Sequence, residues 1–332
     1  MNPEQPIKPE AEKSNKLLTA PEIILPEDIE KMDKSWDATF FSDSHGYTLR
    51  YKNGQMSFTI EYPDRLPDDL TETEKSKFSV NDKIVDGKNV PVFTYQYGSF
   101  KEPEQKESNV GFAPEYHVAE PRDFETDMPE VQQMTVEDLT EFISNKKVIF
   151  YTGAGISAEA GVYNMAQLKE ALGIDQAVPV DGFVRTVLND PETAQNQFRQ
   201  FCQSAFEHEP SPAHQSLAEI AKLKSTKILT ENFDLLQERT GIKPYHTEGA
   251  SLKKDIDPKW FSDIDAIVCV GLSFDDRGLL SWYKANNPSG KIISLDLSQP
   301  TYLGKEDALV KGDLQKILPE VEKQIKIQMG IN

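Results

Sequence analysis

Cysteine is scarce in this sequence. Its 332 residues include only two cysteines, Cys202 and Cys269. Two thiols cannot supply the four ligands of a cysteine zinc site, and one disulfide would be a thin framework for a chain of this length. Cys269 stands in the apolar run AIVCVG, so we expect it to be a buried thiol. This cysteine usage is typical of a reducing compartment and predicts a cytoplasmic protein.

Long apolar runs and dense basic blocks are also absent. No stretch approaches the roughly 18 apolar residues of a membrane span, and the polar N-terminus MNPEQPIKPEAEKSNK has no signal-peptide core. We therefore expect a soluble protein; a secretion route that uses no such signal stays open. The net charge of -19 and the pI of about 4.7 repel a phosphate backbone. Neither a membrane nor nucleic acid is an expected partner.

Composition divides the chain into four predicted parts. Residues 1–20 are rich in Pro, Glu, Lys and Asn and predict a disordered tail. Residues 21–112 predict a small β-rich or α+β region, because YTLRYKNGQMSFTIEY alternates on both sides of a hairpin-type Asn53-Gly54 turn and VPVFTYQYGSF follows as another strand. Residues 113–134 carry Pro and acids and no lysine, and predict an acidic linker. The single histidines His45 and His117 are expected to be surface or core residues rather than ligands.

Residues 135–330 alternate between helical and strand patterns. Thr135, followed by acidic residues, begins a helix with apolar residues at helical spacing. Strands are predicted at KKVIFYTG, TKILTENF, DIDAIVCVGLS and GKIISLDLS, and helices at TAQNQFRQFCQSAF, PAHQSLAEIAKLK and DLQKILPEVEKQIKI. Strands this apolar are buried on both sides, which predicts an α/β fold with a parallel sheet and helices on both faces. Ligands of such sheets bind beyond the carboxyl ends of the strands.

The stretch VIFYTGAGISAEAG, residues 148–161, predicts a strand that ends in a tight turn and opens a helix. Gly153 and Gly155 permit close approach of a phosphate, and amides at a helix start favour negative charge. The spacing differs from the dinucleotide fingerprint G-x-G-x-x-G, and a tight connection without a ligand is an equally good interpretation of this turn alone. Polar or small residues also follow the other predicted strands, at Thr230–Asp234, Gly271–Ser273 and Leu295–Asp296, and Tyr245–Thr247 follow a short loop after Thr240-Gly241.

In this order, the strand-end motifs resemble those of the sirtuin family, the NAD-consuming protein deacylases. The resemblance covers about residues 135–327 and rests on TGAGIS (152–157), SPAH (211–214), TENFD (230–234), HT (246–247), GLS (271–273), LD (295–296) and GD (312–313). It implies a Rossmann-like, sirtuin-like fold over residues 135–330. It also implies NAD as the cofactor and an acylated protein as a candidate partner.

The resemblance also implies roles for individual residues. The residues that would contact NAD are Gly153, Ala154, Gly155, Ser157, Asn232, Asp234, Gly271, Ser273 and Asp296. Catalysis would rest on His246, in the place of the family's general base, together with Asn232. An imidazole with a pKa near ~6.5 can accept a hydroxyl proton at neutral pH. His214, within a helical pattern, is instead expected to be a structural, hydrogen-bonded histidine.

Departures from the family pattern leave the activity open. The family's P-D-F-R is Tyr163-Asn164-Met165-Ala166 here, its T-Q-N carries Glu231, and Thr247 replaces the glycine after the histidine. The two C-x-x-C pairs of its zinc module are missing, so neither zinc nor another metal is expected. The segments that clamp the acyl-peptide as an added strand are missing as well. We favour an NAD-dependent protein deacylase; the alternatives are an NAD hydrolase or mono-ADP-ribosyltransferase, or a degenerate module that binds NAD or ADP-ribose.

Overall fold

A computed structural model describes residues 21–28, 37–42, 47–52, 55–85, 88–98, 128–163, 165–173, 179–247, 256–275 and 278–331. Several predictions from the sequence lie outside these residues: the tail over 1–20, most of the linker, the Asn53-Gly54 turn, His45, His117 and Asn164. No helix among the described residues is long and apolar enough to cross a membrane.

A seven-stranded sheet forms the centre of the C-terminal part, with the strand order β11-β9-β8-β12-β13-β14-β7. Every neighbouring pair in it is parallel. Its strands are β7 (Gln132–Gln133), β8 (Val148–Thr152), β9 (Ile228–Thr230), β11 (Tyr245–His246), β12 (Ala266–Val270), β13 (Lys291–Asp296) and β14 (Ala308–Lys311). The predicted α/β fold with a parallel sheet is confirmed. The short strands β7, β11 and β14 were not predicted.

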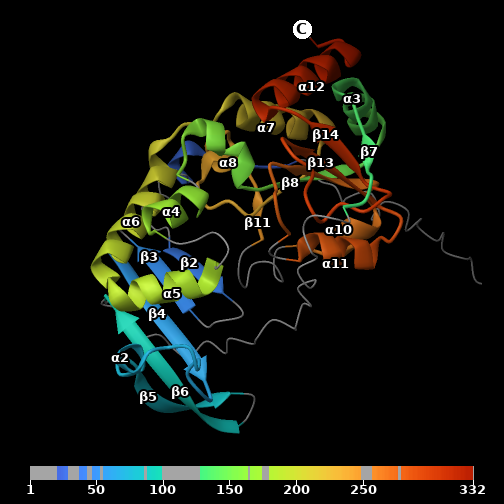
Figure 1. The fold of residues 1–332 in the computed structure, drawn as a ribbon. Helices are drawn as coiled ribbons and strands as arrows, with labels where there is room; N and C mark the ends of the chain where they lie inside the picture. The colour runs from blue at the N-terminus through green and yellow to red at the C-terminus, as the bar shows by residue number, and fades with distance from the viewer. Residues whose placement is uncertain are drawn as a thin grey trace, which may run out of the picture.

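Helices cover both faces of this sheet (Figure 1). One face packs on α3 (Val136–Asn145), α7 (Pro212–Lys224) and α12 (Leu314–Gln328), and the other on α10 (Lys259–Ser262) and α11 (Leu279–Asn286). Thr135 begins α3 with a capping box, as predicted, in which its side chain accepts from Asp138 N–H. All residues of β8 and β12 are buried, Cys269 among them, because each strand faces a helix layer on both sides.

The strand order reverses between β8 and β12, because the chain adds strands first on one side of β8 and then on the other. From β8 the chain continues to β9 and β11 on one side, and then crosses to β12, β13 and β14 on the other. The connections that leave these two neighbouring strands therefore diverge. A divergence of this kind is the place where open α/β sheets bind their ligands.

A second, five-stranded antiparallel sheet forms most of the described N-terminal region, in the order β2-β3-β4-β6-β5. It comprises β2 (Asp37–Ser42), β3 (Tyr47–Lys52), β4 (Gln55–Pro63), β5 (Ser79–Val85) and β6 (Lys88–Tyr97), with α2 (Glu72–Lys75) before β5. The predicted hairpin is present as β3 and β4, where Lys52 pairs with Gln55. The strand predicted at VPVFTYQYGSF is present as β6.

The antiparallel sheet packs on three helices that follow the glycine turn: α4 (Met165–Ala171), α5 (Pro179–Asn189) and α6 (Pro191–Glu207). The ring of Phe58 on β4 lies 5.5 Å from that of Phe198 on α6. One turn further along α6, Phe201 contacts Phe233, with ring centroids 5.3 Å apart. Helix α6 therefore connects the antiparallel sheet to the loop after β9.

Two segments near the predicted domain limits pair with strands of the C-terminal part. Residues Glu22–Ile23 form β1, which pairs with β10 (Ile242–Lys243) of the C-terminal part. At the end of the predicted linker, Val131 is buried and Gln132–Gln133 form β7 at the edge of the parallel sheet. β1 forms a separate two-stranded sheet with β10, whereas β7 extends the parallel sheet; both pair through backbone hydrogen bonds, which composition does not reveal.

Candidate functional site

Two glycine turns meet where the strand order reverses. The first leaves β8 and continues into two short 3-10 helices, η1 (Ala154–Ile156) and η2 (Ala158–Ala160). Gly153 N–H donates to Val270 O (3.1 Å), and Gly155 N–H donates to Gly271 O (2.8 Å). Gly271 has a φ of +61°, and a Cβ atom there would lie 2.5 Å from Ile156 N. These glycines thus allow the backbones of the two turns to touch, while Ala154 and Gly155 remain exposed.

Gly271→Ala is expected to lower the free energy of unfolding by about 2–3 kcal/mol. Roughly 1–2 kcal/mol arises from the left-handed backbone of an L-residue, and the clash with Ile156 N adds to it. Gly241→Ala is the matched control, because Gly241 has a φ of +83° and no atom within 4 Å of an added Cβ. Urea denaturation measures both variants. Equal losses would contradict a packing role for Gly271.

Asn232, which follows β9, connects the loop after this strand to the first glycine turn. Its Nδ2 donates to Gly153 O (3.0 Å) and to Ser157 Oγ (3.3 Å). Ser157 Oγ in turn donates to Asp234 Oδ2 (2.5 Å). Asp234 Oδ1 accepts from Leu236 N–H (3.0 Å), at the start of α8 (Leu236–Arg239). The structure therefore brings together predicted site residues from the ends of two neighbouring strands.

Burial separates these side chains by what they can reach. Ser157 is 2% exposed and Asp234 5%, whereas Asn232 is half-buried. Burial raises the pKa of the Asp234 carboxyl, and the hydrogen bond from Ser157 opposes that shift. Ser157 and Asp234 therefore join the first glycine turn to the loop after β9 through a buried hydrogen bond. The groups at the surface are Asn232 and the backbone of Ala154 and Gly155.

His214 extends this network to α7. Its Nδ1 accepts from Ser211 Oγ (2.8 Å), and its Nε2 lies 3.3 Å from Ser157 Oγ. Because Ser157 donates its own proton to Asp234, the contact with His214 has Nε2–H as the donor. Burial lowers the pKa of His214 to about 4, so the imidazole is neutral at pH 7. The prediction of a structural, hydrogen-bonded histidine is confirmed.

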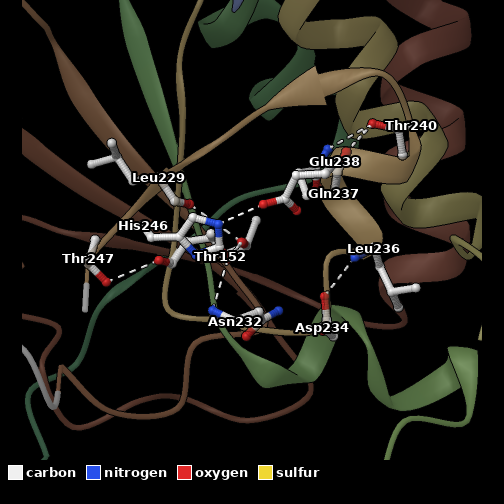
Figure 2. Close-up of polar contacts among 11 residues, drawn as sticks. Thr152, Leu229, Asn232, Asp234, Leu236, Gln237, Glu238, Thr240, His246 and Thr247 are labelled. Carbon is white, nitrogen blue, oxygen red and sulfur yellow. Dashed lines mark hydrogen bonds and ion pairs between the residues drawn. The ribbon is translucent and has the colours of Figure 1, made fainter. Parts of the chain in front are cut away.

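His246 ends β11, next to β9, and pairs with a carboxylate that the sequence analysis missed. Its Nε2 lies 2.6 Å from Glu238 Oε1 (Figure 2). The Glu238 side chain is 2% exposed, whereas that of His246 is 29% exposed. In the sequence, Glu238 stands between Gln237 and Arg239 in LLQERTG, polar neighbours that are typical of a solvated helix position. No signal in that run indicates burial.

Glu231, the residue at the family's glutamine position, also has a buried partner. The hydroxyl of Tyr151 on β8 donates to the Glu231 carboxylate. Tyr151 is fully buried, and burial raises the pKa of its phenol, with the nearby Glu231 charge acting in the same direction. The half-buried Glu231 carboxylate is therefore held by the neighbouring strand rather than pointing alone toward a ligand.

Ser273 and Asp296 lie on the other side of β8. Ser273 is exposed after the Gly271 turn. Asp296 ends β13, where its Oδ1 accepts from Ser298 N–H (3.2 Å) and its backbone oxygen accepts from Gly312 N–H (3.0 Å). Burial raises the pKa of the Asp296 carboxyl. Within the described residues, no hydrogen bond joins Ser273 or Asp296 to the Asn232 network. The same part of the chain contains no group of three or more His, Cys, Asp or Glu side chains that would hold a metal ion.

Comparison with known proteins places this site in a region of detectable similarity. Residues 153–254 match the model of the Sir2 family. An NAD-dependent protein deacylase of Helicobacter pylori is 31% identical over 130 residues, which are 36% of this chain and 55% of the relative. An NAD-dependent protein deacetylase of Enterococcus faecalis is 29% identical over 116 residues, 33% of this chain and 46% of the relative. The chain thus spans about half the length of these relatives.

A crystal structure of a Sir2 homologue in complex with NAD aligns over 60% of this chain and 97% of the homologue's chain, at 18% identity and a TM-score of 0.49.

Proposed function

We propose that this chain, whose residues 153–254 match the model of the Sir2 family, is an NAD-dependent protein deacylase that cleaves the nicotinamide–ribose bond. The observation that carries this proposal is the placement of Asn232 and His246. Asn232 is fixed on the glycine turn at the point where the strand order reverses, and His246 ends the strand beside it. The relatives named as NAD-dependent protein deacylases and deacetylases support it.

The residues present suit NAD as the cofactor. The turn that leaves β8 exposes Ala154 and Gly155 at the end of the sheet where such ligands bind, and Asn232 lies against it. Bound NAD would supply an ADP-ribosyl group with nicotinamide as its leaving group. In this proposal the residues that contact or shape the NAD pocket are Gly153, Ala154, Gly155, Ser157, Asn232, Asp234, Gly271, Ser273 and Asp296. Ser157 and Asp234 act by fixing the turn and the loop.

His246 is the proposed general base. A half-buried, partly exposed imidazole can accept a hydroxyl proton near neutral pH. The Asn232 amide, fixed by two hydrogen bonds, orients the reacting part of the cofactor at the adjacent strand end. The proposal includes an acylated protein as substrate, no zinc and a cytoplasmic location, all three of which rest on the sequence or on the relatives.

Nicotinamide release from NAD tests this function. The purified chain is expected to release nicotinamide only when an acetyl-lysine peptide is present, with the same peptide carrying unmodified lysine as the control. Equal release with and without the acetylated peptide would replace the proposal with NAD hydrolysis or ADP-ribosyl transfer. NAD binding without any release would replace it with a nucleotide-binding module.

A further inference from the structure

We propose that Glu238 is a positioning residue for His246, holding the imidazole in the tautomer that leaves Nδ1 as its basic nitrogen. This inference rests on the proposed function, in which His246 is the general base. It concerns a residue on a different element: Glu238 belongs to α8 and His246 to β11. The contact between them connects two segments that flank the β10 strand in the chain.

The hydrogen-bond geometry fixes the tautomer. A carboxylate only accepts hydrogen bonds, so the nitrogen 2.6 Å from Glu238 Oε1 carries a proton. A neutral imidazole with its proton on Nε2 has its basic lone pair on Nδ1. Proton transfer to His246 would then take place at Nδ1 and leave an imidazolium stabilised by the carboxylate behind it. In many catalytic sites, a third group orients the base through a hydrogen bond in this way.

Burial shows which member of the pair orients the other. Glu238 is 2% exposed, whereas His246 is 29% exposed, so the carboxylate is buried and its imidazole partner is partly exposed. Among the described residues, His246 is the side chain that hydrogen-bonds Glu238. A buried carboxylate without a partner would be costly, and the imidazole supplies that partner.

The element that carries Glu238 is held at both ends. Leu235 enters α8 with a φ of +56°, and Leu236 N–H donates to Asp234 Oδ1. At its other end, Gly241 N–H donates to Glu238 O (2.8 Å), and β10 follows at once. Because β10 pairs with β1, the carboxylate is fixed by a scaffold and not by a loose surface turn.

Other titratable groups surround the pair. Asp234 lies at the start of α8, and its pKa, raised mainly by burial, is also affected by Glu238 and His246. Glu231 and Tyr151 bond to each other at the ends of β9 and β8. None of these groups changes in Glu238→Gln, which keeps the shape of the side chain and removes only its charge.

Glu238→Gln is expected to lower the pKa of the His246 imidazole by about one unit, because the imidazolium loses its opposite charge. A base is active only when neutral, so the acid limb of the pH profile for nicotinamide release moves to lower pH by the same amount. The rate on the plateau is expected to fall about tenfold, because the imidazole loses the group that orients it. Glu238→Asp keeps the charge, so its acid limb is expected to stay near that of the unchanged protein.

Histidine NMR on the full chain provides the readout that is independent of activity. With labelled histidine, His246→Ala identifies the His246 signals among five histidines; the unchanged protein is expected to show the Nε2–H tautomer, and Glu238→Gln the lowered pKa. Glu74→Gln is the matched control: Glu74 is also buried but caps α2 through Thr71, so its loss is expected to leave the titration of His246 unchanged.

Two results would overturn the inference. One is an Nδ1–H tautomer in the unchanged protein. The other is a pKa of His246 that is the same in Glu238→Gln as in the unchanged protein. The NMR result also separates this inference from the proposed function. A shifted His246 pKa in a chain that releases no nicotinamide would support the positioning role and reject the deacylase. Peptide-dependent nicotinamide release with an acid limb that Glu238→Gln does not move would support the deacylase and reject the positioning role.

Discussion

Replacing His246 with alanine is expected to lower peptide-dependent nicotinamide release about 100-fold to 10,000-fold, the usual contribution of a general base. The affinity for NAD is expected to change little, because the proposed pocket is built from the glycine turns and Asn232. His246 instead ends the neighbouring strand, with its imidazole directed to Glu238 (Figure 2). Steady-state release rates and calorimetric titration with NAD measure the two effects separately.

The matched control for this variant is His208→Ala. His208 follows α6 and is half-buried, as His246 is, but its imidazole lies beside Gly161 and outside the strand-end site. Its replacement is expected to leave the release rate within about threefold of the unchanged protein. If His246→Ala releases nicotinamide as fast as His208→Ala does, another group is the base. If His246→Ala also loses NAD binding, the side chain is part of the pocket instead.

Phe58→Ala is expected to reduce the free energy of unfolding by about 3–5 kcal/mol, the usual cost of removing a buried phenyl ring. Phe58 is 3% exposed and packs edge-on against Phe198. The same side of the sheet carries the neighbouring apolar residues of β4, and α5 and α6 cover it (Figure 1). The loss therefore falls on the contact between the antiparallel sheet and the helices that follow the glycine turn. Urea denaturation followed by circular dichroism measures it.

Ile84→Ala provides the control on the same sheet. Ile84 lies on the edge strand β5 and is 79% exposed, so its loss is expected to cost at most about 0.5 kcal/mol. A loss below about 1 kcal/mol for Phe58→Ala would mean that the helices do not bury this face in solution. Since α6 also contacts Phe233, we expect the Phe58 variant to weaken NAD binding as well, in contrast to Ile84→Ala.

The sequence by itself determined the local features of this protein. Its parallel strands are short apolar runs, and a strand buried on both faces needs no polar alternation, so β8 and β12 could be predicted from composition alone. Thr135 and the alternation around Asn53-Gly54 indicated a helix start and a hairpin, because caps and hairpin strands depend on a few neighbouring residues. The order of the strand-end motifs indicated the resemblance to sirtuins, and residues 153–254 match the model of the Sir2 family.

The tertiary structure alone decided which residues meet. Gly271 touches the first glycine turn from the end of another strand, and Glu238 reaches His246 from another element. Neither contact has a sequence signal, because a glycine required by a neighbouring backbone looks like any turn glycine, and a buried glutamate looks like a solvated one. β7 joined the parallel sheet, and β1 paired with β10, through backbone hydrogen bonds, which do not depend on side-chain type. Packing between distant segments, and not local preference, therefore assembled the site.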